Sequence, residues 1–138
     1  MSVQELGDDV TAAAADGWVP VCRVSDLVPE RGAAALVAGE QVALVRLVDG
    51  RVLAVQNLDP FSGAHVMSRG IVGSRGDAPT LASPMYKQVF DLRDGTCLER
   101  AGYTPVAGEG DLRTWAVAVV DGVVHVAAAP RPASGGAA

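Results

Sequence analysis

The side chains that could carry chemistry in this chain are few and far apart. His65 and His125 are its two histidines, and neither has a serine or cysteine at a spacing typical of nucleophilic catalysis. His125 lies inside the apolar run 123–127, which predicts a surface or satisfied structural histidine in a strand. His65 lies in an irregular stretch, and only its residue type supports a role as a catalytic base.

Two aspartates, Asp59 and Asp91, could act together as a general acid and base. Asp59 directly precedes Pro60, which is typical of a turn, and Asp91 lies in a predicted hairpin where it could accept hydrogen bonds from nearby backbone amides. A structural role is therefore favoured for both. Four other aspartates at predicted turns lack the spacing of a calcium-binding loop; these are Asp26, Asp49, Asp94 and Asp121.

The two cysteines, Cys22 and Cys97, have no CxxC spacing and no neighbouring histidine, so a metal site is not expected. Both lie in apolar strand patterns and are predicted to be buried free thiols, which fits a reducing compartment. A disulfide between them stays open at this stage.

The composition indicates one acidic domain of 138 residues. A net charge of −5 without a run of basic residues argues against a nucleic-acid-binding face. Hydrophobic residues make up 49% and aromatic residues only 4%, so the core must be built from Val, Leu, Ala and Ile. No apolar run approaches the ~20 residues of a membrane span, and the acidic N-terminus does not resemble a signal peptide. We therefore expect a cytoplasmic protein with no membrane partner.

Three Asp-Gly pairs, at 49–50, 94–95 and 121–122, separate runs rich in valine. Such pairs predict two-residue turns of antiparallel hairpins, and the whole pattern predicts an all-β antiparallel sandwich or barrel. Residues 1–16 are predicted to be a tail or a short helix, and residues 129–138 a flexible tail. The expected strands cover residues 18–24, 33–37, 42–48, 51–56, 80–82, a hairpin within 83–99, 112–120 and 123–127.

The stretch Ser83–Lys87, followed by Phe90-Asp91 and Gly95, resembles the second cluster-binding segment of a Rieske domain. In that segment the usual pattern is Cys-Pro-x-His-Gly-x-x-Phe-Asp-x-x-x-Gly. The Pro, the Phe-Asp pair and the final Gly are all present here. The ligands are not, and Lys87 replaces the first Gly.

All four positions that would hold a Rieske cluster carry other residues in this chain. Asn57 and Asp59 stand where a Cys-x-His pair would be, while Ser83 and Tyr86 replace the second Cys and His. A Rieske [2Fe–2S] centre needs two thiolates and two imidazoles. Oxygen and amide donors suit neither iron, so the resemblance predicts a Rieske-like domain without an iron–sulfur cluster or any other metal.

This combination of frame and missing ligands is similar to the small subunit of assimilatory NAD(P)H-dependent nitrite reductase. The resemblance spans roughly residues 17–127 and is carried by four segments: Trp18–Cys22, Asn57–Ser62, His65–Gly70 and Ser83–Lys87. It implies a Rieske-like domain over residues 17–128, with a subdomain of about 57–99 formed by the former cluster-binding loops.

The resemblance also implies a function in a complex that reduces nitrite to ammonium. In that family the large subunit carries FAD, a [4Fe–4S] cluster and siroheme, so no cofactor and no catalytic residue are expected in this chain. Its partner would be the large subunit, whose assembly or activity it would assist. The alternatives are a free-standing Rieske-like binding module and, less favoured, a Rieske-type electron carrier.

The former cluster loops supply a candidate partner surface. Its predicted members are Phe61, Met67, Met85 and Tyr86 as apolar anchors, with Lys87 at the rim. The alternative is that these side chains pack into the volume of the lost cluster, and the sequence leaves both interpretations open.

Overall fold

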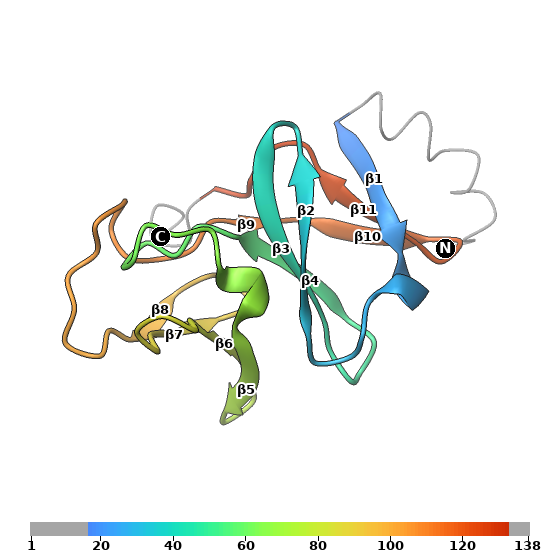
Figure 1. Cartoon of the computed structure of the whole chain (residues 1–138). Helices are drawn as coiled ribbons and strands as arrows, with labels where there is room; N and C mark the ends of the chain where they lie inside the picture. Colours follow the sequence, from blue (N-terminus) through green and yellow to red (C-terminus); the bar gives the residue numbers. More distant parts are fainter. Residues whose placement is uncertain (1–16, 133–138) are drawn as a thin grey trace.

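The computed structural model describes residues 17–132, so the predictions for residues 1–16 and 133–138 lie outside the described residues. Within residues 17–132, eleven strands form three antiparallel sheets (Figure 1). The predicted all-β fold is thereby confirmed. The two helices in this range are 3₁₀ turns of three residues each, η1 (Val24–Asp26) and η2 (Met67–Arg69), and neither could span a membrane.

The strands divide into one sheet of three strands and two sheets of four strands. The first sheet has the order β1-β11-β10, the second β2-β3-β4-β9, and the third β5-β6-β7-β8. Figure 1 shows the third sheet to one side of the other two. The strand bounds are β1 Trp18–Arg23, β2 Gly32–Val37, β3 Glu40–Arg46, β4 Val52–Gln56, β5 Ile71–Arg75, β6 Ala78–Ala82, β7 Val89–Asp91, β8 Cys97–Glu99, β9 Thr114–Trp115, β10 Val117–Val120 and β11 Val123–Ala127.

The second sheet is buried on both faces, and β3 shows this most clearly. Successive side chains of a strand point to opposite faces. Val42 and Leu44 pack in one core with Val124 and Val126 of β11. The alternate residues Ala43 and Val45 instead join a second core with Leu81 and Phe90 of the third sheet, together with Phe61 and Met67. The second sheet therefore lies between the first sheet and the third sheet.

The predicted strand 112–120 is divided between two sheets. Thr114 and Trp115 form β9 and pair with β4, whereas β10 pairs with β11. Between them, Ala116 accepts a backbone hydrogen bond from Ala127, so the chain crosses from one sheet to the other at this residue. The valine-rich pattern alone could not show the crossing, because both halves are equally apolar.

Only one of the three Asp-Gly pairs forms the expected two-residue turn. Asp121 and Gly122 both have positive φ (52° and 76°) and connect β10 to β11 directly. At 49–50 the prediction was wrong. A hydrogen bond from Leu47 N to Arg51 O closes a three-residue loop in which Gly50, but not Asp49, has positive φ.

The pair at 94–95 also differs from the prediction, because it lies in a longer connection between β7 and β8. Gly95 has φ 81°, and its amide donates to Asp91 O. A Cβ at this position would lie 1.9 Å from Leu112 O. Close approach as well as backbone conformation therefore requires glycine here.

Gly95→Ala should destabilise the fold more than Gly122→Ala does. Both positions have left-handed φ, which costs an alanine about 1–2 kcal/mol, but a Cβ at Gly122 meets nothing within 4 Å. At Gly95 the collision with Leu112 should add about 1–3 kcal/mol of overpacking strain. Urea denaturation of the two variants measures the difference. Equal losses in the free energy of unfolding would contradict the close approach.

Candidate functional site

Two loops meet beside the second core. The first follows β4 directly and covers residues 57–66, and the second, residues 83–88, connects β6 to β7. The Gln56 side chain fixes the entry to the first loop, because its amide donates to Leu58 O (2.8 Å) and accepts from Arg113 N (2.8 Å). The four positions predicted from the Rieske pattern all lie in these two loops.

Asp59 and Ser83 are both buried and join the two loops. The Ser83 hydroxyl donates to Asp59 Oδ2 at 2.6 Å, and Ser62 donates to the same oxygen at 2.9 Å. The other carboxylate oxygen accepts from Phe61 N at 2.9 Å, while Ser83 Oγ accepts from Met85 N at 3.1 Å. The turn role predicted for Asp59 is thus too limited, because its carboxylate also accepts a hydrogen bond from a residue 24 positions away.

Asn57 is the third buried member of the set and fixes the far side of the first loop. Its Oδ1 accepts from Ser68 N at 2.7 Å. Its Nδ2 lies 3.1 Å from Gln41 Oε1 and 3.3 Å from His65 O, so it can donate to both. A single amide side chain therefore ties β3, the first loop and η2 together.

Tyr86, the fourth position, lies at the surface and away from this buried network. Its ring stacks on Tyr103 with 4.4 Å between centroids and 10° between planes. Tyr103 belongs to the long connection between β8 and β9, the orange loop in Figure 1. The same connection reaches the first loop, because Val106 N and Ala107 N both donate to Pro60 O.

The sequence prediction missed this third loop. A signal for it was present, since Tyr86 and Tyr103 are the chain's only two tyrosines in a sequence with 4% aromatic residues. Their separation of 17 positions, across an irregular Gly-rich stretch, gave no local pattern that would predict the contact.

Lys87 adopts a left-handed backbone conformation with φ 68°. It occupies the position at which the Rieske pattern carries glycine. A positive φ raises the free energy of L-residues but not of glycine, so this backbone geometry accounts for the glycine of the pattern. Its amide donates to Ser83 O, which closes the turn of the second loop. The lysine side chain is exposed.

Two predicted members of the partner surface are not at the surface. Phe61 and Met67 are buried in the second core, and the Phe61 ring lies 6.2 Å from that of Phe90. The prediction was wrong for these two residues, because apolar side chains in a loop can point inward as readily as outward. Met85, Tyr86 and Lys87 are exposed.

The residues at the four positions do not fit a [2Fe–2S] cluster. Asn57, Asp59 and Ser83 offer oxygen and amide groups that are already engaged in hydrogen bonds within the chain, and Tyr86 stacks on Tyr103. Thiolate and imidazole are the ligands that such a cluster takes. Across residues 17–132, moreover, no three His, Cys, Asp or Glu side chains gather in a way that could hold a metal ion.

The histidines lie in unlike environments. His125 is buried in β11, as a structural histidine would be, with Nδ1 3.1 Å from Val123 O, although Nε2 has no partner among the described residues. His65 is exposed. Its backbone carbonyl, not its ring, accepts a hydrogen bond from the Asn57 side chain. Neither imidazole forms a hydrogen bond with a serine or cysteine side chain within residues 17–132.

The cysteines are free thiols that pack against different cores. Cys22 borders the core between the first and second sheets, and Cys97 borders the core between the second and third sheets. Burial is the main cause that raises the pKa of each thiol, so neither is activated as a nucleophile. Partial burial replaces the full burial that the sequence predicted.

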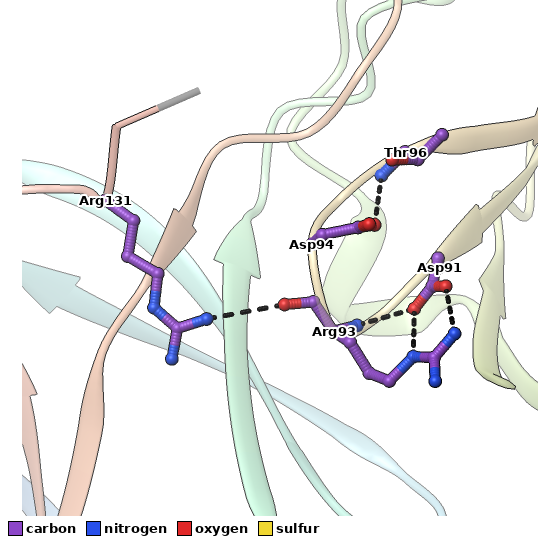
Figure 2. A network of polar contacts seen from close by, with 5 residues as sticks. All are labelled: Asp91, Arg93, Asp94, Thr96 and Arg131. Carbon is purple, nitrogen blue, oxygen red and sulfur yellow. Dashed lines mark hydrogen bonds and ion pairs between the residues drawn. The ribbon is translucent and has the colours of Figure 1, made fainter. Parts of the chain in front are cut away.

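Asp91 serves the turn after β7, as predicted, and also forms an ion pair. It accepts from Arg93 N at 2.8 Å, and Arg93 Nη2 lies 2.8 Å from its Oδ2 (Figure 2). The hydrogen bond from the Arg93 side chain is the main cause that lowers the pKa of Asp91. Figure 2 also shows Arg131 reaching the Arg93 carbonyl, at 3.4 Å, which links the turn to the chain after β11.

The comparisons with known proteins agree with this arrangement. Residues 17–127 match the family of Rieske-like [2Fe-2S] domains. The nitrite reductase (NADH) small subunit of Escherichia coli K12 is 36% identical over 110 residues, which cover 79% of this chain and 95% of that protein. The chain belongs to the nitrite reductase small-subunit family.

Two further relatives bear on this family assignment. A Mycobacterium tuberculosis structure described as an NADH-dependent nitrite reductase small subunit superposes with a TM-score of 0.70 and 44% identity, over 84% of this chain and 96% of that one. The nitrite reductase [NAD(P)H] large subunit of Klebsiella oxytoca is 38% identical over 109 residues, which are 79% of this chain but 11% of that protein. A segment like this small subunit therefore occurs inside a large-subunit polypeptide.

Ser83→Ala should cost this small subunit about 1–3 kcal/mol, since it leaves a buried oxygen of Asp59 without one of its donors. In an Asp59→Ala background the same change should cost much less, because the partner is already absent. Chemical denaturation of the four proteins in the cycle gives the coupling free energy. A coupling near zero would show that the hydrogen bond does not join the loops.

The Asp91–Arg93 pair should make stability depend on pH. The folded pKa of Asp91 is lowered, so its contribution is present above the unfolded value of about 4 and is lost as pH falls through the folded value. Between pH 5 and pH 2, Arg93→Leu should therefore lose less stability than the wild type. Arg51→Leu is the matched control: it removes the exposed pair with Asp49, where screening leaves little to lose. The same pH dependence in all three proteins would contradict the assignment.

Proposed function

We propose that this chain is the cofactor-free small subunit of a cytoplasmic NAD(P)H-dependent nitrite reductase, which reduces nitrite to ammonium. The large subunit would carry FAD, the [4Fe–4S] cluster and siroheme, and so both hydride acceptance and nitrite reduction. This chain would assist the assembly or the activity of that subunit. Its half-buried free cysteines are compatible with a reducing compartment.

The observation that carries the proposal is the hydrogen-bonded network at the former ligand positions. Asn57, Asp59 and Ser83 are buried; the Ser83–Asp59 hydrogen bond joins the two loops, and Asn57 ties the first loop to β3 and η2, so these residues connect the chain where ligands would hold iron. An electron carrier needs a redox centre, and this donor set offers no place for a Rieske cluster. The network therefore argues against the carrier and for a structural role.

The Klebsiella oxytoca protein supports the choice of partner. In that large subunit a segment similar to this chain is part of the same polypeptide. Covalent linkage keeps two domains at high effective concentration, which is useful when they must remain together. A free-standing binding module would gain nothing from such a linkage. In addition, the volume of the lost cluster, where such a module would bind a ligand, is crossed by the buried Asp59–Ser83 hydrogen bond.

A non-catalytic role agrees with the surroundings of the titratable groups. Asp59 accepts hydrogen bonds from backbone and hydroxyl groups, and Asp91 is paired with Arg93. Neither histidine forms a recorded contact with a carboxylate or a nucleophile. General acid–base catalysis needs a group free to exchange a proton with substrate, and this chain is not expected to supply one.

The purified chain should contain no iron, show no visible absorption, and bind the large subunit from the same organism. An affinity-tagged chain should retain a flavin- and siroheme-containing protein of the native cell, identified by absorption and mass spectrometry. Two iron atoms per chain together with a Rieske EPR signal after reduction would overturn the cofactor-free assignment. Failure of the purified subunits to associate would overturn the proposed partnership.

A further inference from the structure

We propose that the exposed end of the former cluster loops is the surface that docks the large subunit, with a stacked tyrosine pair at its centre. We call this surface the tyrosine tip and define it as Met85, Tyr86, Lys87, Tyr103 and Val106. The proposal rests on the proposed function, which supplies the partner. It assigns to that partner an apolar recess that receives the tyrosines and a carboxylate that pairs with Lys87.

The tyrosine tip gathers large apolar side chains that remain in contact with solvent. Met85 is 48% exposed, Tyr86 38%, Tyr103 46% and Val106 70%. Both tyrosines of the chain are here, whereas both phenylalanines and Trp115 are buried. Tyrosine and methionine are enriched in the buried centres of protein interfaces, so this end has the composition of a binding site.

The tip is built from two loops that contacts within this chain already hold in place. The Ser83–Asp59 hydrogen bond and the Lys87 N to Ser83 O hydrogen bond hold the second loop. The third loop is held by the two amides that donate to Pro60 O, and stacking joins it to Tyr86. A surface ordered in advance loses little conformational entropy on binding, which favours an interaction role over a loosely packed loop end.

Lys87 adds charge and a strained conformation to the same place. It is the only lysine in the sequence, in a chain whose net charge is −5, and it forms no ion pair within residues 17–132. Its φ of 68° would suit glycine better. Strained backbone at non-glycine residues concentrates at functional sites, and a cation at the edge of an apolar patch matches an acidic group on a partner.

Affinity measurements with the purified large subunit of the same organism test the surface. Tyr86→Ala and Tyr103→Ala should each weaken binding about 30-fold or more, the loss typical of a central interface residue. Lys87→Glu should weaken binding and reverse its dependence on salt. Ile71→Ala is the matched control, because it truncates a 60% exposed apolar side chain on β5 and should leave the affinity unchanged. Circular dichroism and thermal melting show first that each variant is folded.

Lys87→Gly separates a docking role from a packing role. Glycine relieves the positive φ, so this variant should melt no lower than the wild type, yet it should bind the large subunit more weakly. Because Lys87 is the only lysine, carbodiimide cross-linking of the complex followed by peptide mapping should join this side chain to a carboxylate of the large subunit. Wild-type affinity in the Gly variant, or cross-links that never include Lys87, would place the surface elsewhere.

The outcomes distinguish this proposal from the function on which it rests. If the wild-type chain does not bind the large subunit, the proposed function fails. If the wild type binds and all tip variants bind equally well, only the tyrosine tip is overturned. If the tyrosine variants instead dissociate a dimer of this chain without changing the affinity for the large subunit, the tip is a contact between two copies, and the docking proposal is wrong.

Discussion

The hydrogen bond from Ser83 to Asp59 is the interaction on which the shape of this molecule's functional end depends. It joins two loops that no backbone hydrogen bond connects in the part of the chain that the structure describes, and both partners are buried. In a Rieske domain, iron would join the two loops at these positions. Here the hydrogen bond between the Ser83 hydroxyl and the Asp59 carboxylate makes that connection. Asn57 joins the first loop to η2 by accepting a hydrogen bond from Ser68 N.

Burial of β3 on both faces anchors this end of the molecule to the sheets. Val45 on one face packs against the third sheet, and Leu44 on the other packs in the core shared with the first sheet. Phe61 and Met67 extend the second core into the first loop, so the loop is anchored by apolar packing as well as by hydrogen bonds. The side chains left outside, above all Tyr86 and Tyr103, are then held in place by the third loop.

Sequence patterns predicted the parts of the structure that local rules govern. The Asp121-Gly122 turn, most strands and the loss of all four ligand types follow from residue types at fixed spacing. Contacts between distant segments did not follow: the crossing at Ala116, the inward orientation of Phe61 and the stack of Tyr103 on Tyr86 depend on how sheets and loops pack. Lys87 lies between these cases: the sequence showed that it replaces a glycine of the Rieske pattern, but only the structure showed its positive φ of 68°.

Amide hydrogen exchange of the isolated chain, followed by NMR, tests most directly whether side-chain hydrogen bonds hold the former cluster loops. The informative amides are those of Phe61, Ser68 and Met85, which donate to Asp59, Asn57 and Ser83 respectively. These three amides should exchange as slowly as amides in the central strand β3, because opening them requires disruption of the second core. Exchange as fast as that of exposed loop amides would show that the loops are not fixed by this network, and would contradict the account.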